Sequence, residues 1–285
     1  MTQWPALQQA RSFEADARVP FVTVDADGAP LVLGAVARAH LRALHRWPHW
    51  LQVSEHRVQL VASRTAWSDA FAAMNAVLRD DGMIVAWRDE PFMLFDTSGR
   101  SLGVTIERAA TRFWGTLTWG AHCNGYVADA QGQPAALWVA RRALTKPTDP
   151  GCLDNLIGGG VPHGQSPHDT VVREGWEEAG LTPEQMTGLQ RGSTVRLLRD
   201  IPEGLQREWI EVYDLALPQG LVPQNQDGEV GELMCLPIAD ALGPQTIDEM
   251  TVDAALVTLD FARRRRLLPP TEQAALEQAW VALQT

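Results

Sequence analysis

Residues 159–181 read GGVPHGQSPHDTVVREGWEEAGL, and this stretch decides the fold and the chemistry expected of the chain. Ser166 and Pro167 suit the start of a helix, and Gly180 suits the left-handed residue that ends one, so we predict a helix over residues 167–179. Residues three and four positions apart share a helix face, which gathers three carboxylates on this one. They are Glu174, Glu177 and Glu178.

The repulsion among these carboxylates indicates a bound cation. Like charges at helical spacing cost helix stability, and a hard divalent cation such as Mg²⁺ removes that cost by taking carboxylate oxygens as ligands. The glycine-rich residues 158–164 before the helix allow close backbone approach and present amides to an anion at the helix N-terminus. The stretch therefore predicts that a metal and a phosphorylated ligand meet on one helix.

The same stretch resembles the Nudix box, G-x5-E-x7-R-E-U-x-E-E-x-G-U, in which U is an apolar residue. The match runs from Gly159 to Leu181 and holds at seven of nine fixed positions. Gln165 replaces a glutamate of the pattern, and Gly175 replaces an apolar residue. We interpret Gln165 as tuning activity, and Gly175, which weakens a helix interior by about 1 kcal/mol relative to alanine, as a mark of close packing.

This resemblance implies a hydrolase that cleaves a diphosphate bond with Mg²⁺, or Mn²⁺ as the alternative metal. The implied metal ligands are the carbonyl oxygen of Gly159 and the side chains of Glu174, Glu177 and Glu178. Glu174 is also implied as the residue that orients or deprotonates the attacking water, and Arg173 braces the carboxylates by charge-assisted hydrogen bonds.

Around this helix the apolar pattern of the 285 residues predicts an α+β protein in two domains. We expect a Nudix fold, an α-β-α sandwich with a mixed sheet between helices, over residues 118–285, after a smaller α+β domain over residues 1–117. The boundary is placed in the passage between Gly115 and Gly120. Strands are expected at 21–24, 58–61, 83–87, 92–95, 102–106, 124–128, 136–142, 193–198, 205–217 and 232–236, and helices at 37–45, 68–79, 252–266 and 271–283. Two hairpins are expected, 83–87 with 92–95 and 124–128 with 136–142.

A narrower resemblance covers residues 31–242. The segments that carry it are residues 87–90, 107–108, 122–126, 146–164 and 227–230. They are similar to the Nudix subfamily described as thiamine pyrophosphokinase-related, whose members have an extra N-terminal domain. The resemblance implies cleavage of thiamine diphosphate, or of its oxidised and damaged forms, to the monophosphate. It does not imply kinase activity, because no GxxxxGK[ST] loop is present.

Several side chains outside the box are candidates for substrate binding. Arg88 and Arg108 suit phosphate capture, although surface ion pairs or an internal salt link between the domains are the simpler explanation. On the strand at 205–217, alternation places Trp209 and Glu211 on one face, which either lines a pocket for a flat ring or is an outer face covered by a helix. Two loop residues complete the set, Lys146 as a substrate ligand and Glu229 as a substrate or further metal ligand.

Composition limits the partners. The net charge of −11 disfavours binding to the nucleic-acid backbone, and no apolar run is long enough to cross a bilayer. The resemblance to the Nudix box implies a small-molecule diphosphate as partner, and a homodimer is left open. Three widely separated cysteines indicate reduced thiols, and the sequence lacks a secretion-signal pattern, so a cytoplasmic location is the default.

Three alternative functions stay open at this point. The substrate class could instead be nucleoside diphosphate derivatives such as ADP-ribose. Isopentenyl-diphosphate isomerases share the Nudix fold and use a cysteine with a glutamate, for which Cys123 is the counterpart here. A protein that binds a diphosphate as a sensor is disfavoured by the complete glutamate triad.

Overall fold

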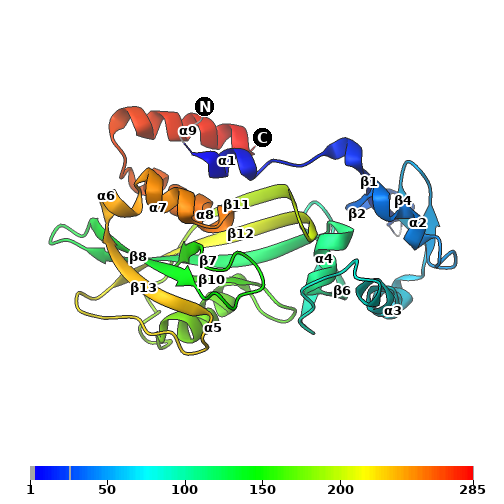
Figure 1. The fold of residues 1–285 in the computed structure, drawn as a ribbon, viewed down its shortest axis with the longest axis horizontal. Helices are drawn as coiled ribbons and strands as arrows, with labels where there is room; N and C mark the ends of the chain where they lie inside the picture. The colour runs from blue at the N-terminus through cyan, green and yellow to red at the C-terminus, as the bar shows by residue number, and fades with distance from the viewer. Residues whose placement is uncertain (1–3, 26, 285) are drawn as a thin grey trace.

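The computed structural model describes residues 4–25 and 27–284, and it confirms a mixed sheet between helices preceded by a smaller α+β region (Figure 1). The strands are β1 (Arg18–Val24), β2 (Pro30–Ala37), β3 (Leu51–Val53), β4 (Val58–Leu60), β5 (Pro91–Phe95), β6 (Ser101–Glu107), β7 (Leu117–Ala128), β8 (Pro134–Arg142), β9 (Leu153–Asn155), β10 (Ile157–Gly160), β11 (Gln190–Ile201), β12 (Gly204–Leu217) and β13 (Val230–Pro237). The α-helices are α1 (Pro5–Gln9), α2 (Leu41–Leu44), α3 (Trp67–Asp80), α4 (Arg108–Trp114), α5 (Pro167–Ala179), α6 (Ile238–Ala241), α7 (Pro244–Glu249), α8 (Val252–Arg265) and α9 (Pro270–Gln284). Among the described residues no helix is long and apolar enough to cross a membrane.

The N-terminal region is a four-stranded sheet in the order β2-β1-β4-β3, packed with α3 and α4. Its core holds Phe21, Phe71 and Trp114, and the Trp114 indole donates to Asn75 Oδ1 at 2.8 Å. Burying three aromatic rings of this size accounts for much of the cohesion of the region.

The hairpin expected between residues 83–87 and 92–95 is wrong. Residues 83–87 form turns rather than a strand, because Ala86 has φ +58° and interrupts any extended run. The backbone amides of Arg88 and Glu90 instead donate to the Glu107 carboxylate, at 3.1 and 3.0 Å. β5 pairs with β6 and β7.

The second sheet is organised by β7. Its neighbours are β12, parallel along residues 117–127, β10 at residues 120–123, and β8 at residues 126–128. The passage from Gly115 to Gly120, where the sequence placed the domain boundary, is largely strand. Gly120 is needed there for packing, because a Cβ at this position would lie 2.9 Å from Glu208 Oε1. β5 and β6 join the same sheet, so the domain boundary at 117/118 stays a prediction.

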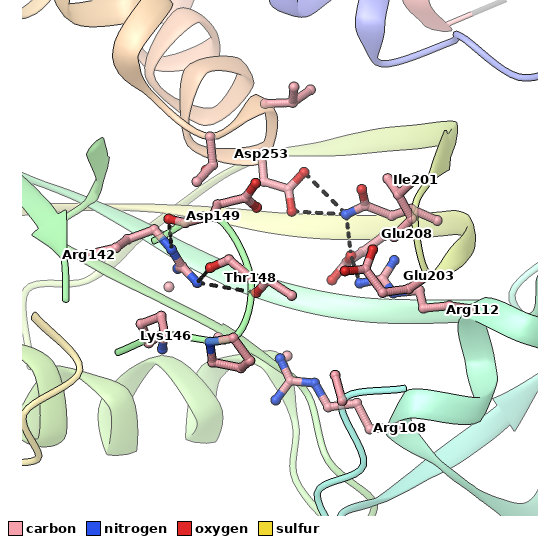
Figure 2. Close-up of a pocket in the computed structure, with 18 of the residues that line it drawn as sticks. Arg108, Arg112, Arg142, Lys146, Thr148, Asp149, Ile201, Glu203, Glu208 and Asp253 are labelled. Atoms are coloured by element: carbon pink, nitrogen blue, oxygen red, sulfur yellow. Dashed lines mark hydrogen bonds and ion pairs between the residues drawn. The ribbon is translucent and has the colours of Figure 1, made fainter. Parts of the chain in front are cut away.

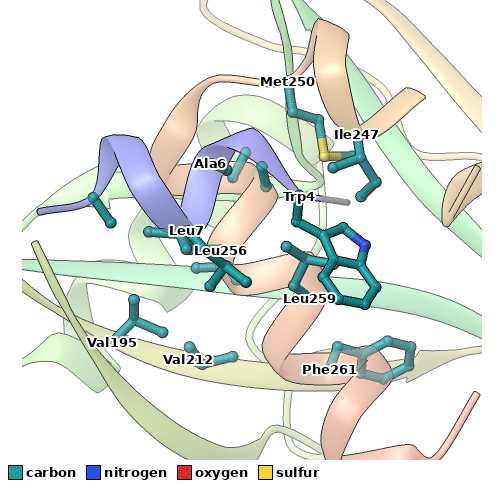
Figure 3. Close-up of a cluster of buried hydrophobic side chains, with 14 of the residues drawn as sticks. Trp4, Ala6, Leu7, Val195, Val212, Ile247, Met250, Leu256, Leu259 and Phe261 are labelled. Carbon is teal, nitrogen blue, oxygen red and sulfur yellow. The ribbon is translucent and has the colours of Figure 1, made fainter. Parts of the chain in front are cut away.

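Helices cover both faces of this sheet. α5 packs on one face and α8 on the other. Side chains of β12 alternate between them: Ile210 and Val212 are buried in the cluster under α8, and Tyr213 in the cluster under α5. Figure 3 shows Val212 beneath α8 residues Leu256 and Leu259.

The N-terminal residues pack on the C-terminal region, an arrangement that the sequence did not indicate. α1 lies beside α8 and α9 (Figure 1), with Trp4 and Leu7 buried in their cluster (Figure 3). The carbonyls of Ala10 and Ser12 accept the amides of Leu198 and Asp200, at 2.8 and 2.9 Å, and so extend the edge of β11. The chain therefore begins on one region, crosses to the other, and returns.

Candidate functional site

The predicted helix α5 is confirmed with its caps. Ser166 and Asp169 form a reciprocal capping box, Pro167 occupies the first turn, and Gly180 ends the helix at φ +65°. This fixes the rotation of the helix, so that Glu174 and Glu178 face the short strand β10. A Cβ on Gly159 would lie 2.2 Å from Glu174 Oε1, which means that only glycine lets this carboxylate lie against the β10 backbone.

Two partners hold the three glutamates. Arg173 donates to Glu174 Oε1 at 2.6 Å and also to Glu177. Glu178, which is buried, accepts the amide of Gly158 at 2.8 Å. Arg173 therefore braces two carboxylates, as the resemblance implied.

Burial makes this cluster electrostatically unfavourable without a cation. Burial, and then the neighbouring charges of Glu174 and Asp154, raises the pKa of Glu178 well above its ordinary value. Burial also raises the pKa of Glu174, against the attraction of Arg173. Hard oxygen donors in a buried cluster of like charge fit a divalent cation. As they stand, no three Asp, Glu, His or Cys side chains in the described part of the chain converge as a complete ligand set.

A polar cavity of about 360 Å³ opens beside β10 (Figure 2). Gly158, Gly159, Gly160 and Glu174 form one wall, and the loop after β8 forms a second. The other lining residues come from the segment 85–88, α4, β7, the turn between β11 and β12 with its flanking strands, Glu229 and the start of α8. Its cationic side chains are Arg88, Arg108, Arg112, Arg142, Lys146 and Arg199. The same cavity carries seven carboxylates, and this mixture of charges suits a phosphorylated ligand that binds together with a metal cation. The carboxylates are those of Asp149, Asp154, Glu174, Glu203, Glu208, Glu229 and Asp253.

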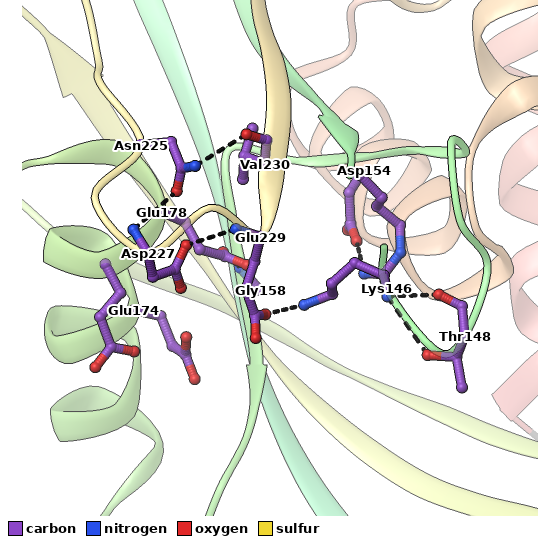
Figure 4. A network of polar contacts seen from close by, with 12 residues as sticks. Lys146, Thr148, Asp154, Gly158, Glu174, Glu178, Asn225, Asp227, Glu229 and Val230 are labelled. Carbon is purple, nitrogen blue, oxygen red and sulfur yellow. Dashed lines mark hydrogen bonds and ion pairs between the residues drawn. The ribbon is translucent and has the colours of Figure 1, made fainter. Parts of the chain in front are cut away.

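Some of these cations are paired and others are not. Lys146 donates to Glu229 (Figure 4), Arg142 to Asp154 at 2.8 Å, and Arg108 to Glu90 at 2.8 Å. No ion pair joins the half-buried Arg88 guanidinium to any described carboxylate. Burial, and then the charge of Arg108, lowers the pKa of Arg88. An anion bound nearby would raise this pKa.

The far wall of the cavity carries an acidic pair. The amide of Gln206 donates to Glu208 at 2.9 Å and to Asp253 at 3.0 Å (Figure 2), and Arg112 pairs with Glu208 at 3.2 Å. Burial, and then the charge of Glu208, raises the pKa of Asp253. His122 also lines the cavity, with Nδ1 2.9 Å from Asn155 Oδ1.

The structure brings together many, but not all, of the candidate residues from the sequence. Gly159, Glu174, Arg88, Arg108, Lys146 and Glu229 line the polar cavity. Arg173, Glu177 and Glu178 belong to α5 and do not line it. Glu211 lines a separate cavity, and Trp209 lines neither. Trp209 is covered by the turn at Gly99, whose Cβ would lie 2.5 Å from its ring, rather than by a helix.

Sequence reasoning missed Arg112, Arg142, Glu208 and Asp253. A signal existed only for Glu208, because it precedes Ile210 and Val212 in the alternation of β12 and so lies on the same face as these residues. The others reach the cavity from α4, β8 and α8, which lie far apart in the sequence.

Both departures from the box have structural explanations. A Cβ on Gly175 would lie 2.4 Å from Met186 Sδ, so the close packing expected at Gly175 is present: methionine fills the space of the missing side chain. Gln165 keeps the role of an acceptor, because Arg173 Nε donates to its Oε1 at 3.3 Å.

The isomerase alternative lacks an accessible thiol. Cys123 is fully buried in the cluster under α5, and burial, with Asp214, raises its pKa well above the ordinary value. It lines neither cavity. A protonated thiol away from solvent does not suit proton transfer to a substrate.

Comparison with known proteins gives two family matches. Residues 121–257 match the NUDIX domain, and residues 6–118 match a domain of unknown function (DUF4743). Nudix hydrolase 20, chloroplastic, of Arabidopsis thaliana is 33% identical over 209 residues, which are 73% of this chain and 55% of that protein. Nudix hydrolase 24, chloroplastic, of the same plant is 34% identical over 209 residues, 73% of this chain and 57% of that protein. The chain thus spans little more than half the length of these relatives.

Among solved structures, the crystal structure of DR0079 from Deinococcus radiodurans is 20% identical, covers 59% of this chain and 97% of its own, and has a TM-score of 0.47. The word chloroplastic describes the two plant relatives. The cytoplasmic location expected from the sequence stays a prediction.

Proposed function

Residues 121–257 are a Nudix domain, and on that premise we propose that the protein is a divalent-metal-dependent hydrolase of small diphosphates, with Mg²⁺ as the metal and Mn²⁺ as an alternative. The observation that carries the proposal is the position of Glu174. Its carboxylate lies against β10 on the wall of a cavity lined by six cationic side chains. A largely buried acid on a cavity that also offers cations to phosphate oxygens suits hydrolysis of an anionic ester or anhydride.

Each residue of the helix has a role in this proposal. Glu174, Glu177, Glu178 and the Gly159 carbonyl would hold the metal, which when bound neutralises phosphoryl oxygens and lowers the pKa of water. Glu174 orients the attacking water or accepts its proton. Arg173 is a positioning residue, because its guanidinium contacts both Glu174 and Glu177.

The cavity supplies the means to bind the diphosphate. Arg88 offers a planar guanidinium with no ion-pair partner among the described residues, so a phosphate oxygen is its natural acceptor. Arg108 and Lys146 lie on the same cavity and would exchange part of their contacts with Glu90 and Glu229 for the ligand. Until a ligand binds, the ion pair with Glu229 holds Lys146 in place.

The finer proposal for the substrate is thiamine diphosphate or an oxidised or damaged analogue, cleaved to the monophosphate. It is supported by the resemblance of residues 87–90, 107–108, 122–126, 146–164 and 227–230 to the thiamine pyrophosphokinase-related subfamily. ADP-ribose and related nucleoside diphosphates are the second candidate, because cations that bind phosphate oxygens do not by themselves distinguish one diphosphate from another.

One experiment tests both levels. The purified protein is incubated with Mg²⁺ and thiamine diphosphate, oxothiamine diphosphate, ADP-ribose or nucleoside triphosphates, and phosphorylated products are separated. We expect a monophosphate from the thiamine compounds in the wild type and no turnover in Glu178→Gln at unchanged thermal stability. Activity confined to the nucleotides would sink the thiamine proposal, and wild-type rates in Glu178→Gln would refute the assignment of the glutamates.

A further inference from the structure

A second cavity, distinct from the polar one, lies beside the N-terminus of α5. Its volume is about 310 Å³, and its walls are mostly apolar, formed by Met93, Phe95, Trp119, Val161, Pro162 and Pro167. The polar side chains on its wall are Ser101, Gln165 and Glu211. An apolar concavity with a few polar groups suits a small organic ring better than a phosphate.

The aromatic wall of this apolar cavity is held from behind. The rings of Phe95 and Trp119 meet edge to face, with centroids 6.4 Å apart. Trp119 packs in turn on Trp209 at 5.3 Å, and the Arg196 guanidinium lies 4.5 Å from the Trp209 ring centroid. Trp209, a substrate-binding candidate from the sequence, thus positions Trp119 and does not face the cavity itself. A flat ligand would meet aromatic faces that are already in place.

Gln165 presents hydrogen-bond donors to this cavity. Its side-chain oxygen accepts Arg173 Nε at 3.3 Å and Thr170 Oγ1 at 3.1 Å. A guanidinium can only donate, so the atom of Gln165 that faces Arg173 must be the oxygen. The amide nitrogen has no partner within residues 4–25 and 27–284, which leaves its two N–H groups for a ligand. A glutamate at this position, as in the box, would offer acceptors only.

Glu211 presents the complementary acceptor. Its side chain is buried, with Arg191 donating to Oε1 at 2.6 Å and the Tyr213 hydroxyl to Oε2 at 3.2 Å. A carboxylate oxygen has two lone pairs, so each oxygen retains one for a ligand. The apolar cavity therefore combines aromatic faces, an N–H donor and a fixed anion.

We propose that this cavity binds the heterocyclic ring of the diphosphate substrate, and that Gln165 and Glu211 recognise a ring edge on which an acceptor lies beside a donor. The edges of 4-aminopyrimidine and adenine have that pattern, because a ring nitrogen accepts and the neighbouring amino group donates. In their keto analogues the ring N–H donates and the neighbouring carbonyl oxygen accepts. The proposal rests on the proposed function and narrows its substrate to diphosphates of such rings. The ring and the diphosphate of one ligand can occupy the two cavities together, because a single residue, Arg173, contacts both Gln165 of the apolar cavity and Glu174 of the polar cavity.

The test measures binding of unphosphorylated rings in the absence of metal. Thiamine and adenosine are titrated into the 285-residue chain by ligand-observed NMR, with wild type, Gln165→Glu and Glu211→Gln compared. Gln165→Glu keeps the oxygen that Arg173 needs and replaces only the donor. Gln185→Glu is the matched control, because Gln185 is exposed and its oxygen accepts a local backbone amide at 2.8 Å. We expect at least one ring to bind, with its dissociation constant raised tenfold or more in both cavity variants and unchanged in the control.

The outcomes separate this proposal from the proposed function. The ring site is refuted if neither ring binds the wild type, even when diphosphates are hydrolysed. It is also refuted if the ring that binds the wild type binds the Gln165→Glu variant equally well. If a ring binds as expected but no diphosphate is cleaved with Mg²⁺ or Mn²⁺, the hydrolase proposal is refuted and the ring site is supported. As a second measurement on active protein, the cavity variants should raise KM for the ring-bearing substrate at least tenfold with kcat changed less than threefold.

Discussion

The substitution Gly159→Ala tests whether the contact between Glu174 and β10 controls activity. An alanine Cβ at this position would lie 2.2 Å from Glu174 Oε1 and 2.6 Å from its Cδ, whereas ordinary contacts begin near 3.4 Å. The carboxylate must therefore retreat by about 1.2 Å. Because it is the end of a flexible side chain, the movement costs the fold little, but it displaces the proposed base and metal ligand.

The magnitude follows from that displacement. A misplacement of about 1 Å at a reacting group costs on the order of 100-fold in rate, which corresponds to about 2.7 kcal/mol in the activation barrier. We expect kcat for the best diphosphate substrate to fall by that factor. The free energy of unfolding should change by less than about 1 kcal/mol, because alanine is favoured over glycine in a strand by about 0.5–1 kcal/mol.

The assay is product release from the diphosphate under saturating Mg²⁺, with thermal unfolding measured on the same samples. Gly188→Ala is the matched control, because its Cβ would meet only Leu215 Cδ1 at 3.7 Å, an ordinary contact. Wild-type kcat in a folded Gly159→Ala protein would refute the role given to this contact. An equal loss in the control would show that the effect is not local to Glu174.

Three further perturbations test separate parts of the structure. Arg88→Met keeps most of the side-chain stem but removes the unpaired cation, so KM for a diphosphate should rise about tenfold or more, since a charged hydrogen bond contributes about 1.5–3 kcal/mol; an unchanged KM in steady-state kinetics would remove Arg88 from the site. Gly175→Leu should destabilise the protein by more than about 1 kcal/mol through overpacking against Met186, and adding Met186→Ala should recover part of that loss in urea unfolding; additive losses would contradict the explanation. Trp4→Ala should cost about 3–5 kcal/mol, because Trp4 is 5% exposed among the C-terminal helices, whereas the 39% exposed Phe13→Ala should cost far less; similar urea midpoints for the two would refute the packing role of the N-terminal segment.

The misplaced strand at residues 83–87 shows where local pattern fails. Met83, Ile84 and Val85 have the apolar, branched character of a strand, but Ile84 is buried in the N-terminal core while the backbone turns around it. The amides of Met83 and Ile84 donate to the Leu78 carbonyl at 2.8 and 3.2 Å, so they are not available to a strand partner. The amide of Arg88, just beyond the expected strand, binds the carboxylate of Glu107, nineteen residues along the chain. A contact of that separation leaves no sign in a window of ten residues.

By itself the sequence determined α5 and its chemistry, because the determinants are local. Caps, dipole residues and three glutamates at helical spacing all lie within residues 166–180, and the helix forms as they predict. The alternation in β12 likewise determined that Trp209 and Glu211 share a face, since side chains of a strand alternate whatever its partners are. It did not determine which helix covers either face.

Only the tertiary structure decided how these parts meet. It brought Arg88, Arg142 and Asp253 to one cavity from three separate elements, and it placed Trp119, not Trp209, on the wall of the apolar cavity. It also packed Trp4 on the C-terminal helices. These outcomes depend on β7, which pairs with strands far from it in sequence on both edges. Such pairings follow from the packing of the whole chain, so no local pattern of residues could have indicated them.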